Sequence, residues 1–194
     1  MHLLAALVLA AQVQLTAELA LYRFWRPPDV TSVSGVLAVP LAALTFVPDS
    51  TGQTRTATYR IGVEFHDANG TVLHRSAWSE HVTTGAGALP PGAQGVATLD
   101  FNLHPGRYAI LVTVTDSVSG ASTRVSRTLE TTGQRPPAGD LILATALRRL
   151  AAGEAAPQGH LQRSGLAISP NLGGIVAGER STISLFTEVY PPAG

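Results

Sequence analysis

The sequence predicts an all-β protein, an antiparallel immunoglobulin-like β-sandwich that follows an apolar N-terminal segment. From Pro27 onward, apolar and polar residues alternate with a period of two, as they do in strands that bury one face. Turn signals separate these strands at a spacing of about 8–12 residues, which is typical of sandwiches and barrels.

Composition and charge exclude several classes of protein. The chain has 194 residues, and its 13 basic residues balance its 13 acidic residues. A nucleic-acid-binding protein needs a positively charged surface, and the sequence has no basic block. The absence of cysteine excludes disulfides, cysteine nucleophiles and Cys-based zinc sites. A hydrophobic fraction of 45% is too high for a disordered chain.

The N-terminus resembles a signal peptide. Residues 1–11 (MHLLAALVLAA) have the length and apolarity of its central region, and the small residues Ala10 and Ala11 suit a cleavage site. Two features depart from that pattern, because no Arg or Lys precedes the apolar run and residues 12–25 stay half apolar. An uncleaved membrane anchor and an ordinary helix are the alternatives. We predict a signal peptide or N-terminal apolar segment over 1–22. Its presence predicts export of the chain to the periplasm or the exterior.

The first strands follow from alternation and turns. A strand broken at Pro40 is expected over 31–46, either at a sheet edge or passing between sheets, because proline donates no ladder hydrogen bond. Residues 58–66 and 71–82 form a predicted hairpin, with Val72, Trp78 and Val82 on one face.

The next strands are expected over 96–103, 107–116 and 121–130. The clearest of them is the second, because four apolar side chains alternate along one face: Tyr108, Ile110, Val112 and Val114. The Gly/Pro-rich stretch 131–139 reads as a linker.

The C-terminal part is less regular. Residues 140–152 suit either a helix capped by Asp140 or a strand buried on both faces, and 153–165 read as a loop. Two further strands are expected over 166–170 and 182–190. The predicted domains are therefore a sandwich over 27–150 and two strands of a partial second β-module over 160–194.

Three segments resemble the immunoglobulin-like region of bacterial secreted GWxTD-domain proteins. They are Val39–Phe46, Leu103–Gly120 with its Pro-Gly-Arg-Tyr start, and Gly165–Tyr190. The resemblance covers about residues 30–190, although the Gly-Trp-x-Thr-Asp motif itself is absent. It implies the fold and export, favours a strand at 140–147, and implies that a truncated second sandwich begins near 160. It implies no activity, because the family's role is largely undefined.

Three histidines on the predicted hairpin are candidates for a metal site. His66, His74 and His81, together with Glu64 or Glu80, have side chains of the types that hold zinc. By parity, however, His66 and His74 face opposite sides of the strand pair unless a bulge intervenes. We therefore predict no metal site here.

Other motifs have simpler interpretations. The stretch 67–70 resembles a calcium loop but lacks its further oxygen ligands, so a hairpin turn is predicted. Arg148-Arg149, the only basic pair, is expected at a solvated end of an element. The sequence has no nucleophile elbow and no phosphate-binding glycine loop.

An aromatic and basic cluster surrounds Trp25. It comprises Tyr22, Arg23, Phe24, Trp25 and Arg26. Packing in the sandwich core is expected for its aromatic residues, and an interfacial position at a membrane is the alternative.

We therefore predict a non-catalytic exported module with an interaction or structural role in the bacterial cell envelope. No catalytic, cofactor-binding or metal-binding residue is predicted, and no cofactor. An accessory domain of a larger envelope enzyme is the alternative, and a stand-alone enzyme is disfavoured because acid, base and nucleophile do not combine. Apolar residues on both faces of 182–190 predict a protein partner or self-association through this strand. Membrane contact is expected only through an uncleaved N-terminal segment.

Overall fold

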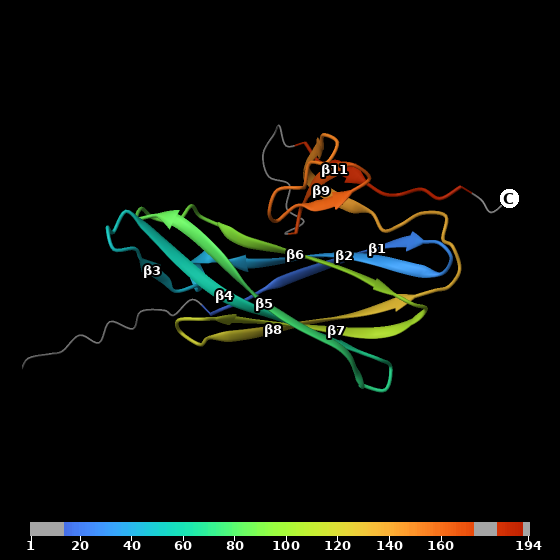
Figure 1. Ribbon diagram of the computed structural model, residues 1–194, viewed down its shortest axis with the longest axis horizontal. Helices are drawn as coiled ribbons and strands as arrows, with labels where there is room; N and C mark the ends of the chain where they lie inside the picture. The colour runs from blue at the N-terminus through green and yellow to red at the C-terminus, as the bar shows by residue number, and fades with distance from the viewer. Residues whose placement is uncertain (1–13, 173–181, 192–194) are drawn as a thin grey trace, which may run out of the picture.

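The computed structural model describes residues 14–172 and 182–191, and these form an all-β fold with antiparallel sheets (Figure 1). The predicted all-β class with antiparallel sheets is thereby confirmed. The predicted signal-peptide region 1–11, like part of the predicted second module, lies outside the described residues.

Two sheets build the sandwich. The first sheet contains three strands in the order β1 (Glu18–Arg26), β2 (Val30–Pro40) and β6 (Gln94–Leu103). The second sheet contains five strands, with β5 at one edge: β5 (Val72–Gly85), β4 (Thr54–His66), β7 (Gly106–Asp116), β8 (Ser122–Thr131) and the short β3 (Phe46–Pro48), which pairs with β4.

The core between these sheets follows the predicted alternation. Val33 and Leu37 of β2 are buried in one cluster with Ile61 of β4 and Val112 of β7. On β7, Ile110, Val112 and Val114 are buried as predicted, and Tyr108 is half-buried at the end of the core.

The chain changes sheet at Pro40. Strand β2 ends there, a single 3-10 turn spans Leu41–Ala43, and β3 continues in the second sheet. The predicted passage between sheets is confirmed. The edge alternative is wrong for β2, which lies between β1 and β6, because Pro40 is its last residue and its missing N–H interrupts no ladder there.

The sandwich begins earlier than predicted. β1 starts at Glu18, and both Leu15 and Leu19 are buried in the core, so a sandwich start at residue 27 and an apolar segment reaching residue 22 are wrong. Residues 15–25 looked like the tail of the apolar run because one face of β1 packs in the sandwich core and the other face, at Phe24, is also buried.

The predicted hairpin is present with one correction. β4 and β5 pair along their length, and a register shift at Phe65/His66 places His66 opposite Val72 and Phe65 opposite His74. Because this bulge inserts Leu73, Val72 leaves the face of Trp78 predicted for it and is exposed.

The C-terminal strands form a small sheet of their own. Its order is β10 (Leu161–Arg163), β11 (Leu166–Pro170), β9 (Ile142–Arg149) and β12 (Ser184–Phe186). A strand over 140–152 is thus confirmed, but only one face is buried, since Ile142 is covered and Leu143 is exposed.

This small sheet moves the predicted domain boundary. β9 pairs with β11 and β12, so it does not belong to a sandwich ending at 150. β10 lies in a stretch predicted as loop, because three residues are too few to display a period. The division falls instead in the linker that follows β8.

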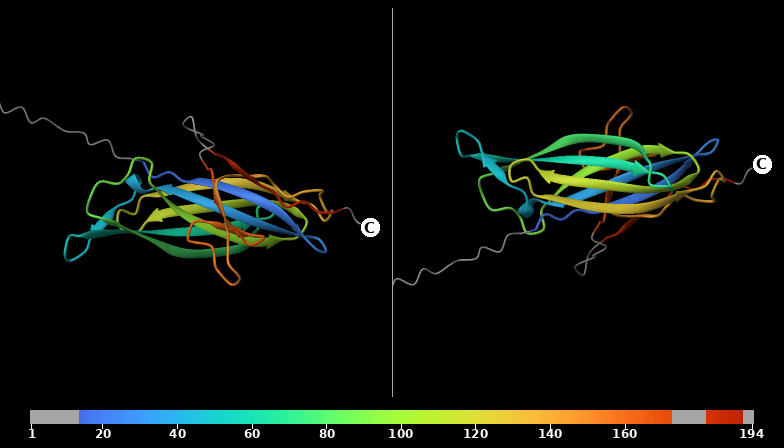
Figure 2. Two further views of the ribbon diagram at one scale, coloured as in Figure 1. Left: turned by 90° about the horizontal axis from the view of Figure 1, so that it is seen from above. Right: turned by 90° about the horizontal axis from the view of Figure 1, so that it is seen from below.

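The small sheet covers the outer face of the first sheet (Figures 1 and 2). Phe24 and Val36 of the first sheet are buried against Ile142, Ile168 and Phe186 of the small sheet. The Phe24 and Phe186 rings lie 6.1 Å apart. The fold therefore has three layers, with the first sheet buried on both faces, and its strands cross beneath those of the small sheet in Figure 2.

Candidate interaction site

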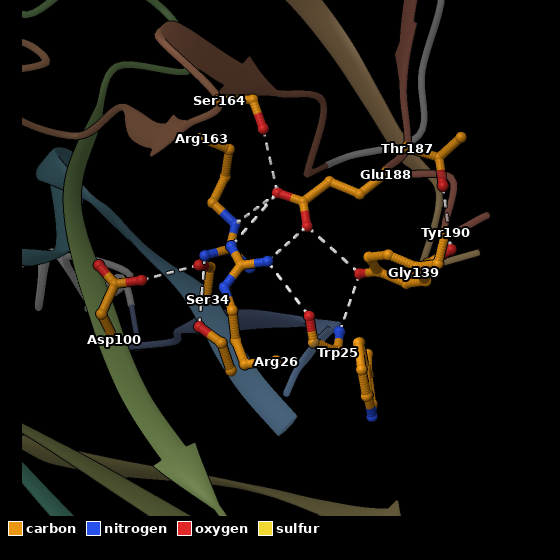
Figure 3. A network of polar contacts seen from close by, with 11 residues as sticks. Trp25, Arg26, Ser34, Asp100, Gly139, Arg163, Ser164, Thr187, Glu188 and Tyr190 are labelled. Atoms are coloured by element: carbon orange, nitrogen blue, oxygen red, sulfur yellow. Dashed lines mark hydrogen bonds and ion pairs between the residues drawn. The ribbon is translucent and has the colours of Figure 1, made fainter. Parts of the chain in front are cut away.

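A polar network centred on Glu188 joins the small sheet to the sandwich (Figure 3). Glu188 follows β12, and its Oε2 accepts hydrogen bonds from Arg26 Nη1 at 2.9 Å and from the Tyr190 hydroxyl at 3.2 Å. Its Oε1 accepts from the Ser164 hydroxyl at 3.2 Å and lies 3.7 Å from Arg163 Nε. One carboxylate thus contacts β1, the end of β10 and the C-terminal segment.

Arg163 is the buried cation of this network. The residue is only 8% exposed, and its guanidinium carbon lies 4.0 Å from the centroid of the Phe24 ring. Its Nη1 donates to the Ser32 hydroxyl at 3.3 Å. Burial lowers the pKa of Arg163, and the negative charge of Glu188 opposes that shift.

Glu188 is held in its ionised form. Burial by itself would raise the pKa of this carboxyl, but the hydrogen bond from Arg26 and the charges of Arg163 and Arg26 lower it below the ordinary value. The carboxylate is therefore a fixed counter-charge, which is a structural role.

The chain beyond Glu188 is docked on the linker and on β1. The Trp25 backbone N–H donates to the Tyr190 hydroxyl at 2.8 Å, and the two rings meet edge to face. Gly139 donates its N–H to the Glu188 carbonyl at 2.8 Å. A Cβ at Gly139 would lie 2.8 Å from the Phe24 ring, so only glycine allows this approach.

The linker itself is clamped to β1. The Arg23 guanidinium makes two bonds to the Asp140 carboxylate, Nε to Oδ2 and Nη2 to Oδ1, each at 2.9 Å. The region predicted as a partial module, 160–194, is therefore attached to the sandwich of the same chain in its described part.

The leucine face is the exposed side of the small sheet. We define it by four residues with exposed side chains: Leu141 (54%), Leu143 (39%), Ile183 (37%) and Leu185 (61%). Leu143 and Leu185 are direct cross-strand partners on β9 and β12. Since β12 pairs with β9 alone among the described strands, this apolar cluster adjoins an unpaired strand edge.

The predicted histidine candidates are separated. His74 lies against the Phe65 ring, whereas the His66 ring contacts the Glu64 carboxylate at 3.2 Å on the other side of the sheet. His81 contacts the Thr58 hydroxyl instead. Within residues 14–172 and 182–191, no three His, Asp or Glu side chains are grouped to hold a metal ion.

The Asp67 turn and the arginine pair have structural partners. Asp67 accepts hydrogen bonds from the N–H groups of Asn69 and Thr71, both at 2.8 Å, as expected of a hairpin turn. Arg148 pairs with Glu154 at 2.8 Å, and Arg149 is exposed on β9.

The aromatic cluster packs within the fold, but not in the sandwich core predicted for it, because Tyr22 and Phe24 lie on the face of β1 that the small sheet covers and Trp25 packs against the C-terminal segment. Phe24 is fully buried beneath the small sheet. Trp25 is half-buried between Tyr190 and Arg135, whose guanidinium carbon lies 5.0 Å from the Trp25 ring centroid. In the described part of the chain, no helix has the length and apolarity needed to span a membrane.

Comparison with known proteins supplies no family. The sequence matches no protein-family model and no curated protein. A solved structure described as an "X-ray structure of Northeast Structural Genomics Consortium target SoR45" aligns with a TM-score of 0.36 and 15% identity. The alignment covers 66% of this chain and 94% of that one.

Proposed function

We propose that this chain is a non-catalytic, exported β-sandwich module that binds another protein of the bacterial cell envelope through the leucine face. The exposed cluster on β9 and β12 carries the proposal. Exposed patches of this kind mark protein contacts, and the adjoining edge of β12 offers backbone groups for pairing.

The use of the charged residues agrees with a binding role. The ionised groups that meet at the layer junction are matched within the chain: Glu188 with Arg26 and Arg163, and Asp140 with Arg23. A catalytic acid or base must be free to exchange a proton near substrate. These groups hold layers together instead.

Two features support the immunoglobulin-like assignment. The strand order, with β1-β2-β6 facing β5-β4-β7-β8, matches the sheet division of that class. The Tyr108 hydroxyl, near the start of β7, donates to the His104 carbonyl at 3.0 Å, as does the tyrosine corner of such domains. Sandwiches of this type serve many binding functions, so the leucine face rather than the fold identifies the role.

Export rests on the sequence of residues 1–11. Cleavage after Ala11 would leave the described core whole, because its first buried residue is Leu15. Fractionation of cells that express the chain with a C-terminal tag, followed by N-terminal sequencing, tests this. We expect an exported product that has lost residues 1–11 and a retained product for Leu7→Arg; a cytoplasmic chain that starts at Met1 contradicts export.

Site-specific photocrosslinking in cells tests the leucine face. A photoreactive amino acid replaces Leu185 in one strain and Thr128, an exposed residue of β8, in the control strain. We expect an adduct of defined mass from position 185, identified by mass spectrometry, and none from position 128. Equal adducts from both positions, or none from position 185, contradict the proposal.

A further inference from the structure

The free edge of β5 is the longest unpaired strand edge in the described part of the chain. β5 has 14 residues and pairs with β4 along one side, and no described strand lies along its other side. Such an edge presents a row of N–H and C=O groups that another strand can pair with. The bulge at Leu73 interrupts it, so the regular edge begins at His74.

Side chains on this edge alternate between two environments. Trp78 packs against the sandwich core and His74 against the Phe65 ring, so even-numbered residues face the interior. Odd-numbered residues such as Arg75 face the open side of the second sheet, where Arg75 pairs with Glu64.

A second copy of the chain can pair with this edge about a two-fold axis perpendicular to the sheet. Such an axis keeps both sandwiches on the same side, so even residues must face even residues. With the axis at Ala77, residues 74–80 of each copy pair, and His74 of one copy lies opposite Glu80 of the other. This contact occurs twice by symmetry.

Neighbouring registers lack this match. Moving the axis to Ser76 leaves His74 opposite Trp78, and moving it to Trp78 sets Arg75 opposite His81, two basic groups. Within its own chain the Glu80 carboxylate accepts hydrogen bonds from Trp78 Nε1 and Gln158 Nε2, and its remaining lone pairs can accept one from the His74 ring of the other copy. Polar partners opposite one another across strands are favourable and like groups are not, so the side chains of β5 are complementary to their own copies with the axis at Ala77.

A crevice adjoins this edge at His74. It has a volume of about 320 Å³. Mainly apolar residues line it: Phe65, Leu73, His74, Phe101, Asn102, Leu103 and Tyr108. The strand of a second copy, continuing beyond its Glu80, runs past the mouth of this crevice. Apolar contact thus adds to the backbone pairing at both ends.

We propose that two copies of this chain pair antiparallel through the β5 edge, with Ala77 on the axis, and so join their second sheets into one continuous sheet. This dimer is independent of the leucine face. A contact of seven residues per strand is small, so the dimer forms reversibly and depends on protein concentration.

Sedimentation velocity on the purified chain between about 2 and 200 µM tests the pairing. The wild type should shift from its monomer mass of 20.2 kDa toward twice that mass as concentration rises. His74→Glu sets two carboxylates opposite one another at both ends, and Glu80→Arg removes the acceptor that the His74 ring faces at both ends, so each should raise the dissociation constant about tenfold. Glu18→Arg, an exposed change on β1, is the control and should have no effect.

Mixing the two variants gives the decisive result. In a mixed dimer the introduced glutamate faces the introduced arginine, and the native Glu80 faces the native His74, so association should return to the wild-type level. Thermal melts of each variant establish that it is folded. A monomer at every concentration overturns the proposal, as does a mixture no stronger than its components. Association that Leu185→Glu abolishes and the β5 variants leave unchanged assigns self-contact to the leucine face and likewise overturns it.

Discussion

Glu188→Gln measures how strongly the polar network holds the small sheet. The substitution keeps the size of the side chain and removes its charge. In the folded chain the carboxylate lies 2.9 Å from Arg26 Nη1 and 3.7 Å from Arg163 Nε. The Arg26 side chain is 42% exposed, whereas that of Arg163 is 9% exposed. Without Glu188, one solvated cation and one buried cation lose their counter-charge.

The two cations contribute unequally to the expected loss. Water screens Arg26, so its pair with Glu188 contributes at most about 1 kcal/mol. Breaking a buried pair costs about 3–5 kcal/mol. We expect a total near the lower limit, about 3 kcal/mol, because Arg163 keeps its contact with the Phe24 ring. That is a large share of the roughly 5–15 kcal/mol of a typical domain.

Urea unfolding followed by circular dichroism measures the loss, and hydrogen exchange locates it. Amides of β9 and β12 should exchange faster than those of β7. Glu154→Gln, which removes the exposed partner of Arg148, is the matched control and should unfold like the wild type. If both variants unfold at the same urea concentration, the network does not hold the small sheet and the reasoning is refuted.

The remaining predictions concern pH, the core and two turns. In the folded chain the pKa of Glu188 lies below its ordinary value of 4.5. The ionised carboxylate therefore stabilises the fold above pH 4.5, and this contribution is lost as the pH falls through the folded pKa. As the pH is lowered, the free energy of unfolding should decline less steeply for Glu188→Gln than for the wild type. Val112→Asp should unfold the chain in thermal melts, since burying a lone charge costs several kcal/mol, while Thr113→Asp should be mild; equal effects would contradict the assigned faces. Gly159 and Gly52 both have a positive φ, so replacing either with alanine should destabilise the fold by roughly 1–2 kcal/mol. The melting temperature should fall further for Gly159, where a Cβ would lie 3.0 Å from the Val96 Cβ, and equal falls would show that this contact relaxes freely.

Local alternation predicted the sandwich strands well. On β7 every second residue from Ile110 onward is buried because one face meets the core and the other meets water. The same rule failed at β1, since Phe24 is covered by a layer built from residues more than 110 positions later. A strand buried on both faces has no period, so residues 15–25 resembled the end of an apolar targeting segment.

The site depended on contacts that no local pattern encodes. Arg163 and Glu188 are 25 positions apart, and β10 is too short to display alternation. The sequence 141–143 is apolar at each position, so it identified a strand without telling which side faces the first sheet. Only the packing of Ile142 against Phe24 separates the buried face from the leucine face.

The cover over Phe24 has a consequence for the synthesis of the chain. Phe24 of β1 precedes its partner Phe186 by about 160 residues along the chain. At about 5–20 residues per second, roughly 8–30 seconds separate the two on the ribosome. During that interval the outer face of the first sheet stays bare, so a nascent chain has an apolar surface that chaperones can bind. Synthesis of β12 therefore sets the moment at which this surface can be fully covered.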